Sequence, residues 1–311
     1  HRSGQTKFKT MRKTCLNTVY ELAKKDKKIL FIGSDLGPGV LDDFKKNIPK
    51  RFFMEGVSEQ SIIGLSAGLA IEGFKPYVNT IATFITRRCF EQLAIDLCLH
   101  NLPVKLIGNG GGLVYAPLGP THQAIEDISI LRSLPNMTII APCDAVEMRE
   151  LVKQTRNYKG PIYIRLARGG DKIITSSSEN LQLCKGNLKI KPDKHLFITT
   201  GVMTQLAIEA SKKLKKSKNI NCGVIHLGTV KPLDKKILLK WIPKVEKIVT
   251  VEENVLSGGF GSSILEFTND NFPEHSNKIS RIGLKDTFIK KYGNQDLLLK
   301  DNNLTVENLI K

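Results

Sequence analysis

Residues 53–73 read FMEGVSEQSIIGLSAGLAIEG, so an acidic residue stands at the head of an otherwise apolar stretch. Ser58, Glu59 and Gln60 begin a predicted buried helix, whose small residues allow close packing. Burying the carboxylate of Glu59 beside that helix is costly unless a specific group meets it. Alternatively, Glu59 only lies in the first turn, where the helix dipole favours an acid. The residues alone leave both interpretations open.

Short apolar segments alternate with helical segments on both sides of this stretch. In the N-terminal half the expected strands are residues 27–36, 76–82, 104–110, 138–142 and 162–167, and the expected helices are residues 61–73, 86–100, 122–134 and 145–157. Such alternation predicts an α/β fold with a mostly parallel sheet and helices on both faces. Ligands bind such sheets beyond the carboxyl ends of the strands, which here carry SDLG, TIATF, GNGGG, APCD and ARGG.

The alternation is interrupted once, over residues 169–194, and then resumes. This break reads as a linker or a connecting hairpin, because strand and helix patterns are weak and turn-forming residues are frequent. We therefore predict two α/β domains, each with a mostly parallel sheet flanked by helices. Their expected bounds are residues 11–170 and 195–311, joined by a linker over residues 171–194 and preceded by a tag or disordered N-terminus over residues 1–10.

The composition is typical of a globular protein with reduced thiols. Its 311 residues suffice for two domains, 41% of them are hydrophobic, and no apolar run reaches the roughly 18 residues of a membrane span. The basic start lacks the apolar segment of a secretory signal, and the six scattered cysteines show no metal-ligand spacing. We expect a cytoplasmic protein that makes no membrane contact and has no metal site of its own.

The formal net charge of +17 suggests an anionic partner. Nucleic acid is one candidate, but aromatic residues make up only 6% of the chain and no nucleic-acid-binding motif occurs. The lysines lie in runs such as KKDKK and KKLKKSK, which are typical of solvated helix ends. We therefore do not expect nucleic acid as the main ligand. The positive field can instead attract phosphorylated substrates or an acidic protein.

Three motifs in chain order, GVSEQ, GPTHQ and VEEN followed by GGFGS, form a more specific combination than any one alone. With TFITRRCFEQL, the first resembles the pyrimidine-binding domain of thiamine-diphosphate enzymes. The second narrows the resemblance to the transketolase and deoxyxylulose-phosphate synthase group. The third resembles the C-terminal domain of that group. The resemblance runs from about Met11 to the end, and assigns residues 11–170 and 195–311 to these two domains.

The resemblance implies a cofactor site. Glu59, the acid of GVSEQ, would hydrogen-bond N1′ of the thiamine diphosphate pyrimidine and so help to remove the C2 proton of the thiazolium ring. Phe84, in TFITRR, would stack on the pyrimidine, although composition alone favours an ordinary core residue. Asp35 and Leu36, in GSDLG, match positions near the cofactor.

Arg87 and Arg88 place two cations at the start of a predicted helix, where the helix dipole disfavours them. A nearby anion, from either a substrate or the protein, would resolve this conflict. We assign Arg88 to the cofactor site.

The resemblance also implies a substrate site. His122, in GPTHQ, would contact the substrate oxygens near the reacting carbonyl, although a histidine before a helix is more often a cap or a surface residue. Arg168, in ARGG, would bind a sugar phosphate. Leu118 stands where transketolases commonly have an aspartate, and Gly110 where some members have a histidine. Both departures concern the identity of the substrate.

The GDG and downstream Asn pattern, which holds Mg²⁺ and the diphosphate in these enzymes, does not occur in the sequence. The resemblance therefore implies a split enzyme, whose second polypeptide carries that pattern. We expect an α2β2 assembly in which this chain also contacts a second copy of itself. The expected reaction moves a two-carbon ketol unit from a ketose, expected to be phosphorylated, to an aldehyde.

Three alternatives stay open. The chain could be the β subunit of a 2-oxoacid dehydrogenase E1 component, although GPTHQAIEDISILRSLPN favours the transketolase side. It could decarboxylate pyruvate as a deoxyxylulose-phosphate-synthase-like ligase does. A more remote alternative is a non-catalytic basic binding protein.

Overall fold

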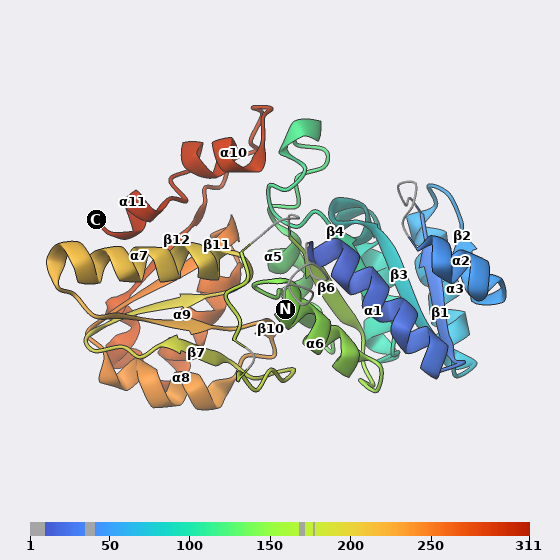
Figure 1. Cartoon of the computed structure of the whole chain (residues 1–311), viewed down its shortest axis with the longest axis horizontal. Coiled ribbons are helices and arrows are strands. Elements are labelled where there is room, and N and C mark those ends of the chain that lie inside the picture. The colour runs from blue at the N-terminus through green and yellow to red at the C-terminus, as the bar shows by residue number, and fades with distance from the viewer. Residues whose placement is uncertain (1–9, 35–40, 168–171, 177) are drawn as a thin grey trace, which may run out of the picture.

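Two mostly parallel sheets organise the chain, which confirms the predicted fold class (Figure 1). The computed structural model describes residues 10–34, 41–167, 172–176 and 178–311. One sheet has seven strands and the other has five. None of the described helices is long and apolar enough to cross a membrane.

The seven-stranded sheet has the order β10-β5-β6-β4-β3-β1-β2, and all neighbours are parallel except β10 and β5. Its strands are β1 (Ile29–Gly33), β2 (Phe52–Met54), β3 (Lys75–Ile81), β4 (Lys105–Asn109), β5 (Thr138–Ile140), β6 (Ile162–Leu166) and β10 (Thr229–Lys231). Every residue of β1, β4 and β6 is buried. Strands covered on both faces read as largely apolar runs, which explains why they were predictable although β4 contains Lys105 and Asn109 and β6 contains Arg165.

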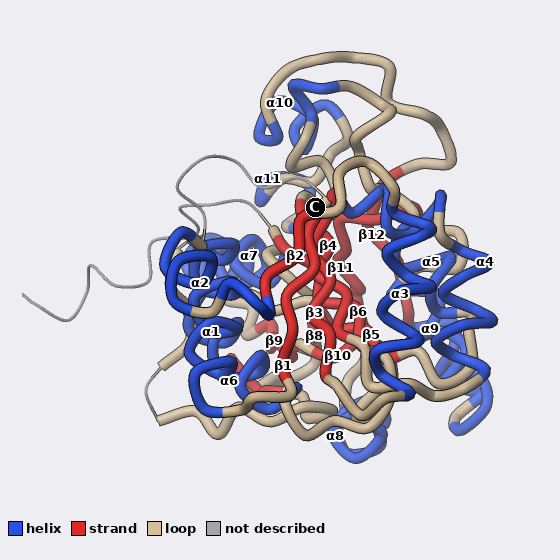
Figure 2. Tube along the Cα trace, turned by 90° about the vertical axis from the view of Figure 1, so that its right-hand side faces the viewer, coloured by secondary structure: helices blue, strands red, loops and turns tan. Residues whose placement is uncertain are grey.

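Helices cover both faces of this sheet (Figure 2). One face carries α1 (Met11–Lys25), α2 (Asp42–Asn47) and α6 (Ala145–Thr155). The other carries α3 (Glu59–Ile71), α4 (Phe90–Gln92) and α5 (Asp127–Arg132), with two π-helical segments, Phe84–Arg88 and Leu93–Leu99, on either side of α4.

The helix expected over residues 86–100 is therefore interrupted rather than regular. The hydroxyl of Thr86 donates to the carbonyl of Ala82 at 2.7 Å, and the thiol of Cys89 donates to that of Phe84 at 3.3 Å. Such side-chain bonds compete with the regular backbone ladder. As a result Arg87 and Arg88 end the first π-helical segment instead of beginning a helix.

The five-stranded sheet has the order β12-β11-β8-β9-β7, and only β7 is antiparallel. Its strands are β7 (Asn187–Ile190), β8 (His195–Thr199), β9 (Cys222–His226), β11 (Lys247–Val255) and β12 (Ile279–Leu284). Its helices are α7 (Met203–Lys218), α8 (Lys235–Trp241), α9 (Phe260–Asn271), α10 (Gln295–Asp301) and α11 (Val306–Leu309). Strand β7 lies within residues 171–194, the segment expected to be a linker.

The two domains are joined through shared structure. Strand β10 follows β9 of the second domain yet pairs with β5 of the first. The ammonium of Lys231, at the end of β10, donates to the carbonyl of Arg132 at 2.8 Å. One continuous hydrophobic core runs from Ile62 in the first domain to Phe267 in the second. The sequence pattern did not predict the pairing of β10 with β5, because β10 has only three residues.

Candidate active site

Glu59 lies just beyond the carboxyl end of β2, as the first residue of α3. The connection between them is tight: Gly56 has a φ of +67°, and the hydroxyl of Ser58 donates to the carbonyl of Glu55 at 2.9 Å. Glu59 is only 3% exposed. The structure thus places the acid of GVSEQ in a buried position at the sheet edge where ligands of α/β folds bind.

Three other predicted site residues gather around Glu59. The Nη1 atom of Arg88 lies 2.6 Å from the Oε2 atom of Glu59. The guanidinium carbon of Arg88 lies 4.5 Å from the ring centroid of Phe84. The Phe84 ring in turn meets the His122 ring edge-on, with centroids 5.2 Å apart and planes at 64°. Residues from three separate segments therefore form one cluster.

The two cations Arg87 and Arg88 are each paired with a carboxylate of the protein. Arg88 pairs with Glu59, and the Nε atom of Arg87 lies 2.8 Å from the Oε1 atom of Glu126. Burial raises the pKa of Glu126, and Arg87 opposes that rise. Glu126 was not among the site residues predicted from the sequence. Its place in GPTHQAIED, four residues after His122, was the available signal.

Several buried polar atoms beside this cluster lack a partner within the described part of the chain. They are the hydroxyl of Thr83 and both amide atoms of Gln123, and each side chain is only 2% exposed. Thr83 precedes Phe84, and Gln123 follows His122. A buried unsatisfied polar group costs about 1–3 kcal/mol. A carboxylate, an aromatic face and unsatisfied hydrogen-bonding atoms together fit a planar heteroaromatic ligand with polar edges.

A cavity of about 210 Å³ opens at the carboxyl ends of β4 and β6. It is lined in part by Arg12, Asn109, Tyr115 and Ala167. The Nε atom of Arg12 and the Oδ1 atom of Asn109 are buried and have no hydrogen-bond partner among the described residues. Neither residue was among the site residues predicted from the sequence. Asn109 ends a predicted strand, whereas no motif marks Arg12.

The two departures noted in the sequence have structural counterparts. At Gly110, whose φ is +77°, a side chain would place its Cβ atom 2.2 Å from the ring of Tyr115. Tyr115 therefore fills the space that a histidine would use. Leu118 is 49% exposed, and a Cβ atom at Gly119 would lie 2.7 Å from the ring of Tyr292 in the second domain. The other predicted site residues, Asp35, Leu36 and Arg168, lie outside the described residues.

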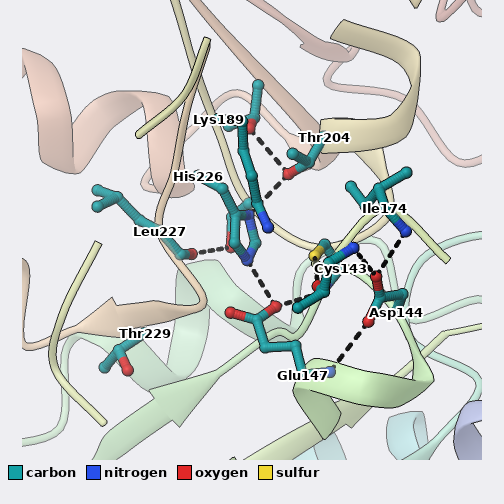
Figure 3. Close-up of polar contacts among 12 residues, drawn as sticks. Cys143, Asp144, Glu147, Ile174, Lys189, Thr204, His226, Leu227 and Thr229 are labelled. Atoms are coloured by element: carbon teal, nitrogen blue, oxygen red, sulfur yellow. Dashed lines mark hydrogen bonds and ion pairs between the residues drawn. The ribbon is translucent and has the colours of Figure 1, made fainter. Parts of the chain in front are cut away.

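A second polar cluster lies at the junction of the domains (Figure 3). Cys143 and Glu147 come from the first domain and His226 from the second, and they offer donor atoms within 4.8 Å of one another. Both ring nitrogens of His226 are engaged: Nε2 lies 2.8 Å from Oε2 of Glu147, and Nδ1 lies 2.7 Å from the hydroxyl of Thr204.

The side-chain atoms that could bind a metal ion are already engaged in hydrogen bonds within the protein. The backbone N–H of Cys143 donates to Oε2 of Glu147 at 2.7 Å, and burial raises the pKa of the Cys143 thiol. A metal ion would need the thiolate and would have to break the His226–Glu147 contact. A Cβ atom at Gly228 would also lie 2.4 Å from Oε1 of Glu147. The cluster is best described as a tightly closed hydrogen-bonded junction between the domains.

Fold and site together define a two-domain α/β protein with a buried acid beside an aromatic ring at the sheet edge. The family model described as "Transketolase, pyrimidine binding domain" matches residues 8–170, and "Transketolase, C-terminal domain" matches residues 185–309. The chain belongs to the transketolase family of thiamine-diphosphate-dependent enzymes, which confirms the resemblance seen in its motifs.

Three similar curated proteins are 1-deoxy-D-xylulose-5-phosphate synthases. That of Clostridium perfringens is 38% identical over 93% of this chain and 46% of its own length. That of Caldanaerobacter subterraneus subsp. tengcongensis is 38% identical over 94% of this chain and 46% of its own. That of Geobacter sulfurreducens is 36% identical over 88% and 43%. The chain thus spans about half the length of these relatives, and it is homologous to the C-terminal half of the synthase.

A solved structure extends the similarity to the whole fold. A split-gene transketolase, solved as an inactive β4 tetramer, matches with a TM-score of 0.87 and 31% identity. The match covers 97% of this chain and 96% of that one.

Proposed function

We propose that this chain is the β-type subunit of a split thiamine-diphosphate-dependent transferase. The enzyme would move a two-carbon ketol unit from a phosphorylated ketose to an aldehyde. The observation that carries the proposal is the buried Glu59 carboxylate, which Arg88 links to the rings of Phe84 and His122, in a chain without the GDG and Asn pattern. The chain supplies the pyrimidine side of a site, and a second polypeptide would supply the Mg²⁺ and diphosphate side.

The chain's own residues have distinct tasks in this proposal. Bound thiamine diphosphate would supply the nucleophilic carbon that attacks the ketose. Glu59 would hold a proton at its Oε2 atom for the N1′ atom of the pyrimidine, and burial keeps competing water away from this carboxyl group. Phe84 would bind the flat face of the pyrimidine.

His122 would exchange a proton with the substrate oxygens near the reacting carbonyl. Its Nδ1 atom lies 2.9 Å from the hydroxyl of Thr121. This contact orients the ring, so we assign the opposite nitrogen, Nε2, to the substrate.

The cavity at the ends of β4 and β6 is our candidate for the phosphate end of the ketose. Arg12 lines it with an unsatisfied Nε atom, and a guanidinium group matches phosphate oxygens. Arg168, which directly follows the cavity residue Ala167 in sequence, would add a second cation. The net charge of +17 would draw anionic substrates toward the site. Leu118 and Tyr115 would favour a substrate with fewer hydroxyl contacts than pentose phosphates have.

Exposed apolar side chains on the outer face of α3 are consistent with the binding of a partner chain. Leu65 and Ile71 on α3 are 44% and 66% exposed, and Leu99 on the adjacent π-helical segment is 67% exposed. Gly64 and Gly68 are also exposed on α3, and a Cβ atom at Gly68 would meet nothing within 4 Å. We assign this exposed face of α3 to the polypeptide with the diphosphate half. Contact with a second copy of this chain would complete an α2β2 assembly.

Reconstitution tests the proposal. The full chain is mixed with a polypeptide that carries the GDG and Asn pattern, together with thiamine diphosphate and Mg²⁺. Ketol transfer to an aldehyde is then followed with a panel of phosphorylated and free ketoses. We expect turnover from the pair and very little from either chain alone. Equal turnover by this chain alone, or none from any combination, would contradict the proposal.

A decarboxylating synthase reaction is the second candidate, because the synthases reach 38% identity over 93% of the chain. It would consume pyruvate and an aldehyde phosphate and release CO₂. Release of CO₂ by the reconstituted pair, with no transfer from any ketose, would favour this reaction over ketol transfer.

A further inference from the structure

Arg88 makes the two contacts that the proposed function assigns to the pyrimidine. Its guanidinium donates to Oε2 of Glu59 at 2.6 Å, and its central carbon lies 4.5 Å from the centroid of the Phe84 ring. A guanidinium group is planar, carries N–H donors along its edge and stacks on aromatic faces. An aminopyrimidine placed between a carboxyl group and a phenyl ring would use the same two features.

We propose that Arg88 is an internal stand-in for the pyrimidine, which the cofactor must displace before it can bind; this inference rests on the proposed function. The same side chain would thereby raise the cofactor concentration that the enzyme needs. Once displaced, Arg88 would be free to meet an anionic group of the substrate or of the partner chain.

The burial of Glu59 explains why its carboxylate needs Arg88 as a partner when no cofactor is bound. Glu59 is 3% exposed, and a buried carboxylate without a partner is unfavourable. Within the described residues, Arg88 provides the only ion pair to Glu59. The contact therefore keeps the acid satisfied and the pocket shaped while no cofactor is bound.

The exposure of the Arg88 side chain explains how it can move away from Glu59. The side chain of Arg88 is 43% exposed, so the guanidinium can swing outward without burying its charge. Phe84 and Arg88 lie on one π-helical segment, and Glu59 begins α3. Displacement therefore requires a side-chain rotation and no movement of a helix.

Because Arg88 competes with the pyrimidine, the apparent affinity for the pyrimidine is the intrinsic affinity multiplied by the fraction of molecules in which Arg88 has left the site. An ion pair with one half-exposed partner contributes less free energy than a fully buried pair. We therefore expect Arg88 to lower the affinity for the pyrimidine by about tenfold. Full-length chain is titrated with 4-amino-5-hydroxymethyl-2-methylpyrimidine, the pyrimidine part of the cofactor, and binding is measured by NMR or calorimetry. We expect Arg88→Ala to bind the probe about tenfold more tightly than the unmodified chain.

Two further variants sharpen the experiment. Arg88→Lys keeps the charge but loses the planar group, so its affinity should fall between those of the unmodified chain and Arg88→Ala. Arg149→Ala is the matched control, because Arg149 on α6 pairs with Glu21 on α1 at 2.8 Å. These two helices lie on the opposite face of the sheet from α3 (Figure 2). It should bind the probe as the unmodified chain does. N-methylguanidine should compete with the probe in Arg88→Ala and have little effect on the unmodified chain.

The outcomes separate this inference from the proposed function. Equal or weaker probe binding by Arg88→Ala, with binding by the unmodified chain intact, would overturn the inference and leave the proposed function standing. No binding by any folded variant, checked by circular dichroism, would overturn both. Tighter binding by Arg88→Ala that N-methylguanidine reverses would support both.

Discussion

The rings of Phe84 and His122 meet edge-on with their centroids 5.2 Å apart, although they belong to different segments. The ring assigned to the cofactor and the imidazole assigned to the substrate therefore share one wall of the site. This placement predicts that substitutions at the two positions affect different steps. We expect Phe84 variants to weaken cofactor binding and His122 variants to slow the reaction.

Replacing His122 by Ala removes the proposed proton donor to the substrate oxygens. We expect kcat/KM of the reconstituted pair to fall by about 10²–10⁴-fold, with cofactor affinity nearly unchanged. Steady-state kinetics and a parallel cofactor titration measure the two effects. A His122→Ala enzyme that lost cofactor affinity but kept kcat would show that the assignment is wrong.

Replacing Arg12 by Ala removes an unsatisfied cation from the cavity at the ends of β4 and β6. A hydrogen bond to a charged group is worth about 1.5–3 kcal/mol, so KM for a phosphorylated ketose should rise about 10–100-fold. KM for the matching unphosphorylated ketose should change little. Lys153→Ala, at an exposed pair with Glu150, is the control. An equal rise for both ketoses would argue against a phosphate site.

Replacing Leu65 by Glu places a charge in the middle of the exposed α3 face. We expect the variant to fold but to lose binding to the partner polypeptide, measured by analytical ultracentrifugation of the mixture. Leu239→Glu is the matched control, since Leu239 is also 44% exposed but lies in the second domain, on α8. Normal assembly of Leu65→Glu would show that the partner binds elsewhere.

The domain junction should be sensitive to acid. Burial opposes ionisation of Glu147, but the attraction and hydrogen bond of His226 outweigh burial and lower the pKa of Glu147 below its usual value. A carboxyl group with a lowered pKa adds stability above its unfolded value of about 4.3, and that stability is lost as the pH falls through the lowered pKa.

We therefore expect the urea midpoint of the unmodified chain to fall as the pH drops below about 4.3. Glu147→Gln should be destabilised by roughly 3 kcal/mol at neutral pH and should lack this part of the pH dependence. Urea titrations between pH 3 and pH 7 measure both effects. An equally acid-sensitive Glu147→Gln variant would place the titrating group elsewhere.

The sequence predicted the two sheets because buried parallel strands leave short, largely apolar runs, as in Ile29–Gly33 and Ile162–Leu166. It did not predict β10, which has three residues and pairs with a strand of the other domain. Short elements carry little periodicity, and a long-range pairing leaves no local signal. A helix over residues 86–100 was predicted, but its π-helical irregularity was not, because its apolar residues still follow a regular helical pattern.

The motifs predicted that Glu59, Phe84, Arg88 and His122 belong to one site, and the structure brings these four together. The motifs did not show that Arg88 pairs with Glu59 and Arg87 with Glu126. Ion pairs between distant segments depend on how the segments pack, which single-residue patterns do not encode. Arg12 was missed for the same reason, because only the folded chain brings it beside Asn109.

The most direct test of the account is the exchange of the C2 hydrogen of thiamine diphosphate for deuterium in the reconstituted pair. We predict that Glu59→Gln slows this exchange by at least about 10²-fold, since general acid–base assistance is lost, while the partner still binds the diphosphate. Exchange in the Glu59→Gln pair as fast as in the unmodified pair would contradict the central assignment of Glu59.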